Sequence, residues 1–275
     1  MRATLSKKMK NSKENLYIIK VGGNIINNNT SLQSFLKDFA AIKGKKILVH
    51  GGGKKATEIG RKLGIKPNYK NGRRITDKKT IDLVTMVYGG LINKQIVAQL
   101  QALNCNAIGL TGADANIIPA NKRPVEEVDY GFVGDIENKR LNAKSLKLFI
   151  ENNLVTVFAA LTHDQKGQML NTNADTIASS LAISLSKAYE VRLIYCFEKK
   201  GILKNMEDDD SVVPLMNKEI YEQMLAADEL FEGILPKLYN AFRAIDEGVD
   251  SVLIGHADDI IENTGEKISG TLIVA

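Results

Sequence analysis

Tryptophan is absent from this 275-residue sequence, and aromatic residues make up only 6% of it. A surface that stacks nucleic-acid bases depends on such side chains, so the composition argues against a base-stacking protein. Apolar runs are short: none approaches the roughly 20 residues that span a bilayer, and no signal-peptide core follows the basic start. The two cysteines, Cys105 and Cys196, fit reduced thiols better than a disulfide framework. We therefore expect a cytoplasmic protein with no membrane association.

Groups for metal or nucleophilic chemistry are also sparse. His50 has no cysteine or carboxylate partner at metal-ligand spacing, and His163 and His256 stand alone. No Ser-His-Asp or Cys-His arrangement can be argued from the sequence. The loop of P-loop enzymes and the glycine fingerprint of dinucleotide-binding folds are both missing. The sequence thus predicts no protein-built metal site and disfavours a nicotinamide-dependent oxidoreductase.

The net charge of +5 comes from the first residues of the chain. Residues 1–13 carry five basic residues and no acid, and the remaining 32 basic residues equal the 32 acidic residues in number. A short basic segment is typical of a solvated arm, so we expect a disordered tail over residues 1–15 and no nucleic-acid partner.

From Leu16 onward, short apolar runs alternate with amphipathic stretches, which is the pattern of βαβ units. The pattern predicts an α/β protein with a mainly parallel sheet. Strands are expected at 16–21, 47–49, 107–110, 155–160, 191–196, 252–254 and 272–274, and helices at 54–63, 174–185, 218–226 and 236–247. Residues 116–128 read as a hairpin or an edge excursion. A division near Lys187 separates two sets of units, although one continuous sheet could run through both.

A long helix is expected after Thr76 and Asp77, which are both suitable caps. Gly89 and Gly90 interrupt its apolar face at a cost of about 1 kcal/mol each relative to alanine. Two interpretations remain open: a local kink, or close packing of another helix, for example from a second subunit.

Two glycine turns follow the first two strands, Gly22-Gly23 and Gly51-Gly52-Gly53. Glycines in this position let backbone N–H groups approach a phosphate. Either turn alone is typical of a tight connection. Two of them at the carboxyl ends of successive strands indicate the crevice in which open α/β sheets bind ligands.

Several polar residues have both a structural and a functional interpretation. Lys20 and Lys237 could be solvated lysines or point charges on a phosphate. Asn171, Asn173 and Asp175 precede a helix and could cap it or bind a ligand. Arg74 could be exposed or could clamp a carboxylate.

Taken together, the motifs of this sequence resemble those of the acetylglutamate kinase branch of the amino-acid kinase family. The resemblance covers nearly the whole chain from Leu16. It rests on Ile19-Lys20-Val21-Gly22-Gly23, Val49-His50-Gly51-Gly52-Gly53, Asn71-Gly72-Arg73-Arg74-Ile75-Thr76, Gly109-Leu110-Thr111-Gly112, Val128-Asp129-Tyr130-Gly131-Phe132-Val133-Gly134, Asn171-Thr172-Asn173-Ala174-Asp175 and Gly270-Thr271. Related kinases for aspartate, uridylate, carbamate and free glutamate share the first glycine turn but lack the Asn-Gly-x-Arg and Asn-x-Asn-Ala-Asp elements.

The resemblance implies a three-layer αβα sandwich around a mainly parallel open sheet. It implies a substrate-binding and dimerisation lobe over residues 16–186 and an ATP-binding lobe over residues 187–275. The implied reaction is transfer of the ATP γ-phosphoryl group to the γ-carboxylate of N-acetyl-L-glutamate, a step of arginine biosynthesis.

Residue roles are implied by the same resemblance. Lys20 and Lys237 would stabilise the transferring phosphoryl group, and Asp175 would orient both. The other implied ATP-binding residues are Gly22, Gly23, Glu198 and Gly201. The implied substrate-binding residues are Gly52, Gly53, Arg74, Asn171 and Asn173. Mg²⁺ would be held mainly by the nucleotide phosphates, without a protein metal site.

The sequence departs from the family pattern in two places. Glu198 stands where many relatives have aspartate, which leaves the ATP contacts near Phe197 and Gly201 less defined. The amphipathic N-terminal helix that accompanies arginine inhibition and hexamers has no counterpart in residues 1–15. The resemblance therefore implies a homodimer that arginine does not inhibit.

Two alternatives to an acetylglutamate kinase remain open, one with a different substrate and one without catalysis. The acyl group could differ, as in N-succinylglutamate, because its size depends on the pocket. A non-catalytic amino-acid sensor could share the fold, although such a sensor would not need Lys20, Asp175 and Lys237 together.

Overall fold

A computed structural model describes residues 13–205, 207–230 and 234–275. Most of the expected tail over residues 1–15 lies outside these ranges. The first strand, β1 (Glu14–Val21), begins two residues earlier than the apolar run predicts. The cause is pairing, because Glu14 is in register with Tyr189 of the neighbouring strand.

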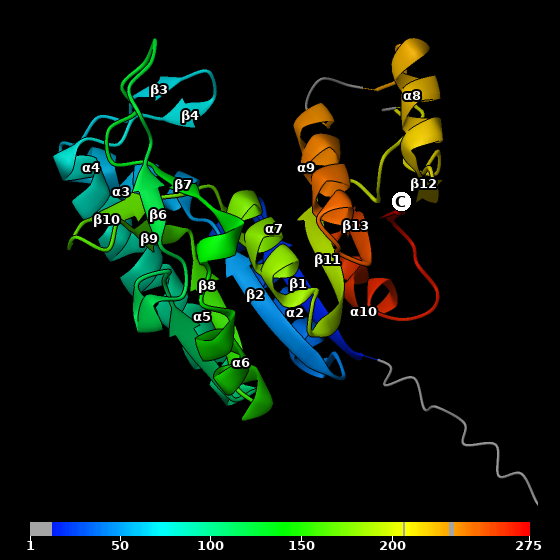
Figure 1. Ribbon diagram of the computed structural model, residues 1–275, viewed down its shortest axis with the longest axis horizontal. Helices are drawn as coiled ribbons and strands as arrows, with labels where there is room; N and C mark the ends of the chain where they lie inside the picture. Colours follow the sequence, from blue (N-terminus) through cyan, green and yellow to red (C-terminus); the bar gives the residue numbers. More distant parts are fainter. Residues whose placement is uncertain (1–12, 206, 231–233) are drawn as a thin grey trace, which may run out of the picture.

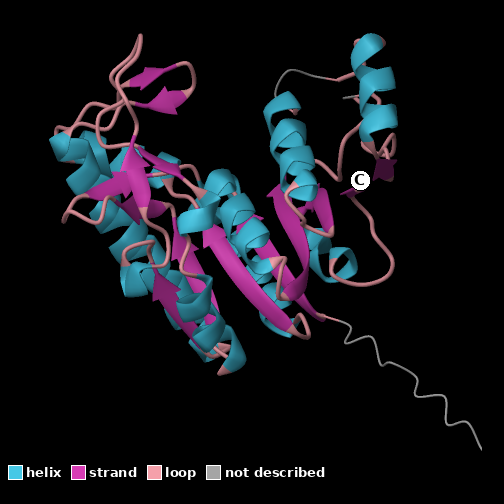
Figure 2. Ribbon diagram, viewed as in Figure 1, coloured by secondary structure: helices cyan, strands magenta, loops and turns pink. Residues whose placement is uncertain are grey.

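One eight-stranded sheet forms the middle layer of the molecule, as Figure 2 shows. Along the sheet its strands are β12 (Leu215–Met216), β14 (Thr271–Ile273), β13 (Ser251–His256), β11 (Tyr189–Phe197), β1, β2 (Lys45–His50), β8 (Val155–Ala159) and β5 (Ala107–Leu110). Every pair is parallel except β13 with β14. The central strands are apolar and buried because helices cover both faces.

Strand β1 joins the two halves of the chain. It pairs with β2 on one side and with β11 on the other, so both sets of units share one continuous sheet (Figure 1). The sequence division near Lys187 falls between α7 (Ala174–Leu185) and β11, within this shared architecture.

Helices cover the two faces of the sheet in separate layers. On one face lie α6 (Ala143–Glu151), α7 and α9 (Leu235–Asp246); on the other lie α2 (Asn29–Ala41), α5 (Asn93–Ala102) and α10 (Ile260–Asn263). The remaining helices are α1 (Gly23–Asn27), α3 (Gly53–Lys62), α4 (Lys78–Val84), α8 (Lys218–Ala226) and the 3₁₀ turns η2 (Asp114–Asn116), η3 (Asn138–Arg140) and η4 (Ala257–Asp259). The fold is thus the expected three-layer αβα sandwich.

The described residues also form three short hairpins outside the main sheet. Figure 1 shows them toward the end where β1 and β2 finish. They pair β3 (Tyr69–Lys70) with β4 (Arg73–Arg74), β6 (Ala120–Lys122) with β7 (Gly134–Ile136), and β9 (Leu161–His163) with β10 (Met169–Asn171). The stretch 116–128 therefore supplies one strand of a hairpin.

The long helix contains a wide turn that the sequence did not predict. Asp77 caps α4, its side chain accepting from the N–H of Thr80 at 2.8 Å. A π-helix, η1 (Thr85–Ile92), then contains Gly89 and Gly90 and leads into α5. Within the described ranges, no helix combines the length and apolarity needed to cross a membrane.

Candidate active site

The carboxyl ends of β1, β2 and β11 lie side by side at one edge of the sheet. Lys20 of β1 is in register with Val49 of β2 and Tyr195 of β11. Each strand ends within two residues of that line. Both glycine turns therefore begin at this edge, as the parallel arrangement requires.

Lys20 forms an ion pair with Asp175 across this edge. Its Nζ lies 2.9 Å from Oδ1 of Asp175, and the two side chains are only 16% and 20% exposed. Asp175 stands in the first turn of α7, where Oδ1 of Asn173 accepts from its N–H at 2.7 Å. Oδ1 of Asp175 is buried and faces the ammonium of Lys20.

Lys237 approaches the same edge from α9. Its Nζ lies 5.0 Å from the centroid of the Phe197 ring, a cation–π contact at the end of β11. No ion pair joins Lys237 to a carboxylate within the described ranges. The lysines thus reach the ends of neighbouring strands, but Asp175 contacts Lys20 and not Lys237.

The two glycine turns have backbone donors available to a ligand. The N–H groups of Gly22, Gly23, Gly52 and Gly53 find no acceptor among the described residues. Such unpaired donors at a strand end suit phosphate or carboxylate oxygens. Together with Lys20 they place backbone N–H donors and an ammonium group at the same end of the sheet.

Gly52 is required by a close approach. A Cβ at this position would lie 2.6 Å from Cδ1 of Ile92 and 2.6 Å from Cδ1 of Tyr88, both on the π-helix. These side chains are buried, so neither can move away freely. The second glycine turn therefore packs directly on η1.

Arg74 links the β3–β4 hairpin to the second glycine turn. Its Nη2 donates to the carbonyl of Gly53 at 2.9 Å and to Oγ1 of Thr57 at 2.7 Å. Its guanidinium lies 4.8 Å from the centroid of the Tyr69 ring. Arg74 is only 9% exposed, so it is not the exposed surface arginine that the sequence also allowed.

The two asparagines occupy different positions. Nδ2 of Asn171 donates to Oγ1 of Thr76 at 3.0 Å, which brings it beside the strand that carries Arg74. Asn173 is the N-cap of α7, so its oxygen is already used by the helix. Asn171 thus joins the Arg74 region, and Asn173 has a structural role.

Glu198 and Gly201, which the resemblance implies as ATP-binding residues, lie beyond the end of β11. Glu198 is exposed, one position after Phe197. Gly201 is buried, and a Cβ there would lie 2.7 Å from Oγ1 of Thr271 and 2.9 Å from Cγ1 of Val212. Gly201 is therefore required by packing of its loop, and neither residue contacts the Lys20–Asp175 pair.

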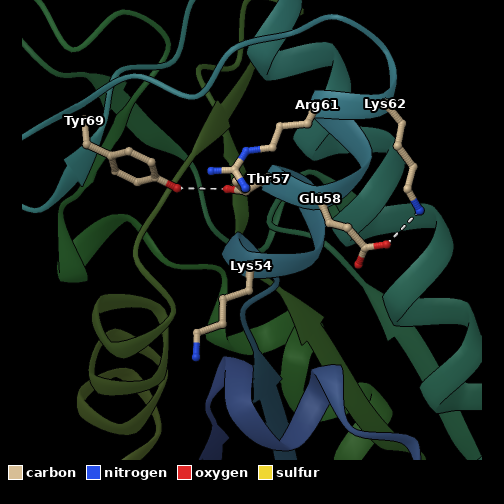
Figure 3. Close-up of a pocket in the computed structure, with 6 residues that line it drawn as sticks. All are labelled: Lys54, Thr57, Glu58, Arg61, Lys62 and Tyr69. Carbon is tan, nitrogen blue, oxygen red and sulfur yellow. Dashed lines mark hydrogen bonds and ion pairs between the residues drawn. The ribbon is translucent and has the colours of Figure 1, made fainter.

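A pocket of about 600 Å³ opens beside the Arg74 region (Figure 3). It is lined by Lys54, Thr57, Glu58, Arg61, Lys62 and Tyr69. Figure 3 shows Tyr69 turned toward Thr57, whose Oγ1 lies 3.1 Å from its hydroxyl, and Lys62 paired with Glu58 at 2.9 Å. The pocket belongs to the α3 and hairpin side of the site, not to the Lys20–Asp175 pair.

His50 precedes the second glycine turn, and the sequence predicted no role for it. The ring is fully buried at the end of β2, its Nδ1 lies 2.8 Å from the carbonyl of Gly51, and its Nε2 lies 3.1 Å from Nδ2 of Asn93. Burial lowers the pKa of His50 to about 4. The partner Asn93 is distant in the chain, so no spacing could reveal it. Within the described ranges, no three His, Cys, Asp or Glu side chains form a group that could hold a metal.

Comparison with known proteins identifies related sequences and folds. The sequence model of the amino acid kinase family matches residues 15–256. Acetylglutamate kinase of Cytophaga hutchinsonii is 54% identical over 264 residues, covering 95% of this chain and 99% of that protein. The enzyme of the same name from Bacteroides thetaiotaomicron is 54% identical over 256 residues, covering 93% and 99%. The crystal structure of smu.665 from Streptococcus mutans superposes with a TM-score of 0.74 at 26% identity, covering 94% of this chain and 98% of that one.

Proposed function

We infer, because the chain belongs to the amino acid kinase family, that it uses ATP to phosphorylate the γ-carboxylate of N-acetyl-L-glutamate. The product is N-acetylglutamyl 5-phosphate, an intermediate of arginine biosynthesis. Full-length relatives named acetylglutamate kinase support this substrate. The observation that carries the proposal is the Lys20–Asp175 ion pair beside four unpaired glycine N–H groups.

The chemistry asks for positioning and positive charge. The γ-carboxylate of the substrate is ionised near pH 7, since its pKa lies near 4, so no general base is needed. It attacks the γ-phosphorus of ATP in line while the bond to the leaving oxygen breaks. We propose that Lys20 and the N–H groups of Gly22 and Gly23 offset charge on the nucleotide phosphates.

We propose that the second catalytic lysine is Lys237, acting on the transferring phosphoryl group. Asp175 orients Lys20 through the 2.9 Å contact. The position of Lys237 has a different support, the 5.0 Å contact with the Phe197 ring. Glu198 and Gly201 remain proposed ATP-binding residues because they follow this ring in the chain.

For the amino-acid substrate we propose contacts with residues at and beside the end of β2. The N–H groups of Gly52 and Gly53 would bind the attacking carboxylate. Arg74 and Asn171 would bind the α-carboxylate and the amide, and Asn173 remains a proposed contact through its exposed position at the start of α7. The bond from Arg74 to the carbonyl of Gly53 supports this arrangement because it joins the two groups of contacts.

We propose that Mg²⁺ is bound mainly through phosphate oxygens of the nucleotide. The donor set supports this assignment, since the carboxylate of Asp175 is paired with Lys20 and the glycine turns beside it offer N–H groups, whereas phosphate oxygens are good ligands for magnesium. When bound, Mg²⁺ would neutralise phosphate charge.

A second candidate substrate is N-succinylglutamate, whose acyl group carries an extra carboxylate. The lining of the pocket beside Arg74 favours testing it. Lys54, Arg61 and Lys62 contribute three cations there against the single carboxylate of Glu58, which is shared between Lys62 and Lys55. A negatively charged acyl group would be attracted to this lining.

One assay tests both candidates and the sensor alternative. Purified protein is given Mg-ATP, hydroxylamine and either acetyl-, succinyl- or free glutamate, and the acyl phosphate is trapped as a hydroxamate. We expect hydroxamate from acetylglutamate and none from free glutamate. Preference for the succinyl compound would establish the second candidate. Absence of hydroxamate with every compound would favour the non-catalytic amino-acid sensor.

The remaining proposals concern lobes, assembly and location. We propose that residues 16–186 bind the amino-acid substrate and residues 187–275 bind ATP, which agrees with Arg74 and Lys237 approaching from opposite sides of β1.

We propose a cytoplasmic homodimer. Buried free thiols of Cys105 and Cys196 support a reducing compartment, and an exposed apolar face on η1, with Met86 57% and Leu91 38% exposed, supports a protein partner.

A further inference from the structure

His50 connects the second glycine turn to the long helix. Its fully buried ring bonds the carbonyl of Gly51 through Nδ1 at 2.8 Å and the side chain of Asn93 through Nε2 at 3.1 Å. Asn93, the first residue of α5, is itself only 1% exposed. Neither residue is exposed enough to contact a substrate directly, so any part in the reaction must act through the turn.

The hydrogen-bond partners allow only one arrangement of protons. The carbonyl of Gly51 can only accept, so Nδ1 of His50 carries the hydrogen. The Asn93 atom facing the ring also donates to the carbonyl of Val157 at 2.9 Å, so it is the amide nitrogen. Nε2 of His50 must therefore accept from it. Burial favours the neutral ring, in agreement with a pKa of about 4.

This arrangement determines the direction of one backbone donor of the site. In a trans peptide the carbonyl of one residue and the N–H of the next lie in one plane and point in opposite directions. The bond from His50 to the carbonyl of Gly51 therefore orients the N–H of Gly52. That N–H has no acceptor among the described residues.

The rest of the turn is held independently of His50. The carbonyl of Gly52 accepts from the N–H of Ala56 at 2.9 Å, and the carbonyl of Gly53 accepts from Thr57 and Arg74. Among the described residues, only His50 bonds the carbonyl of Gly51. The peptide between Gly51 and Gly52 thus depends on His50 for its orientation.

We propose that His50 is a positioning residue for phosphoryl transfer: its bond to the carbonyl of Gly51 aims the N–H of Gly52 at the attacking carboxylate. The inference rests on the proposed function and deepens it by adding a residue that does not touch the substrate. Backbone donors aimed before the reaction lower the barrier because they need no reorganisation when charge shifts.

Two substitutions at one position separate positioning from packing. The side-chain nitrogen of asparagine lies where Nδ1 of histidine lies, so His50→Asn keeps the bond to Gly51 and loses the bond to Asn93. The amide of glutamine lies near Nε2, so His50→Gln does the reverse. We expect kcat within ~3-fold of wild type for His50→Asn and ~10- to 100-fold lower for His50→Gln, with KM for ATP within ~2-fold. Equal kcat for the two variants would overturn the inference.

A matched control accounts for loss of stability. Leu100→Ala removes a fully buried side chain of α5 away from the turn, so it should destabilise the protein and leave kcat unchanged at a temperature where the variant is folded. If Leu100→Ala lowers kcat as much as His50→Gln does, the fall in kcat comes from general loss of stability and the inference fails.

A second readout separates this inference from the proposed function. In protein labelled with ¹⁵N-glycine, the amide signal of Gly52 should shift further in His50→Gln than in His50→Asn, because both variants lose the ring but only His50→Gln loses the bond to Gly51. Wild-type protein that yields no hydroxamate would overturn the proposed reaction while the Gly52 signal still reports on His50. Equal shifts in the two variants would overturn the role of His50 even in an active enzyme.

Discussion

Lys237 is the proposed catalytic lysine whose removal should lower turnover without affecting the fold. It is half-buried, and its one close partner among the described residues is the ring of Phe197. We expect Lys237→Ala to lower kcat by ~10²-fold or more, because the charge of the transferring phosphoryl group loses its counter-charge, with the melting temperature nearly unchanged. Lys218→Ala, which removes an exposed lysine paired with Asp246, is the control and should leave kcat unchanged. Unchanged turnover in Lys237→Ala would remove this lysine from the site.

The buried ring of His50 should make stability depend on pH. Its pKa is about 4 in the folded protein, against about 6.5 for histidine in an unfolded chain. Between these values the unfolded chain binds more protons, so the free energy of unfolding falls as pH falls from about 6.5 toward 4. We expect a loss of about 2 kcal/mol between pH 7 and pH 5 that His50→Asn does not show. Urea unfolding of both proteins at the two pH values measures it, and parallel losses would contradict a neutral buried ring.

How far the sequence predicts single residues depends on whether they stand in motifs. Lys20 and Asp175 stand in motifs beside a glycine turn and a helix start, and the structure brings them to 2.9 Å. The Phe197 ring under Lys237 was not predicted, because contact between two distant segments leaves no local pattern. The same holds for Asn93, which reads as an ordinary helix residue until its bond to His50 is known.

At the scale of elements, the packing of the second glycine turn on the π-helix gives the clearest prediction. Gly52→Ala would place a Cβ 2.6 Å from buried atoms of Tyr88 and Ile92. We expect a loss of about 1–3 kcal/mol in the free energy of unfolding and a fall in kcat, because the turn must shift. Denaturant unfolding and the hydroxamate assay measure the two effects.

Gly89→Ala is the matched control for that substitution. Gly89 lies in the π-helix on which the second glycine turn packs. A Cβ at Gly89 would lie 3.4 Å from Leu161 and 3.6 Å from Thr111, which are distances of ordinary contact. We expect both stability and kcat near wild type. A Gly52→Ala protein as stable and active as Gly89→Ala would mean that η1 does not support the turn.

Secondary structure was predictable from the sequence where a segment has one clear period. The helices at 174–185 and 218–226 are found with the bounds expected from their apolar spacing. The π-helix was not predicted, because the pattern of Val84, Val87 and Tyr88 fits an ordinary helix as well. Antiparallel pairing of β14 with β13 also leaves no mark in a three-residue apolar strand.

At the scale of the whole molecule, the exposed face of η1 makes assembly testable. Met86 and Leu91 lie on it, and a Cβ on Gly90 would meet no atom within 4 Å. We expect a homodimer in sedimentation velocity, and we expect Met86→Glu to weaken it because a buried unpaired charge is costly. Leu148→Glu, at an equally exposed position on α6, should leave it intact. A monomeric wild-type protein would contradict the proposal.

Regulation is tested on the same preparation. We expect arginine not to reduce hydroxamate formation and not to change the sedimentation coefficient, since residues 1–15 lack an apolar stripe that could link dimers. A hexamer, or inhibition by arginine, would be the contrary result.

The place of β1 in the middle of the sheet has a consequence for folding during synthesis. During synthesis β1 leaves the ribosome early and gains β2 soon afterwards, whereas its other neighbour, β11, is made much later. Until β11 emerges, one side of the future central strand presents unpaired backbone groups that could pair with another nascent chain. Completion of the sheet must therefore wait until β11 has been made, so the central pairing of the sheet joins segments far apart in the chain.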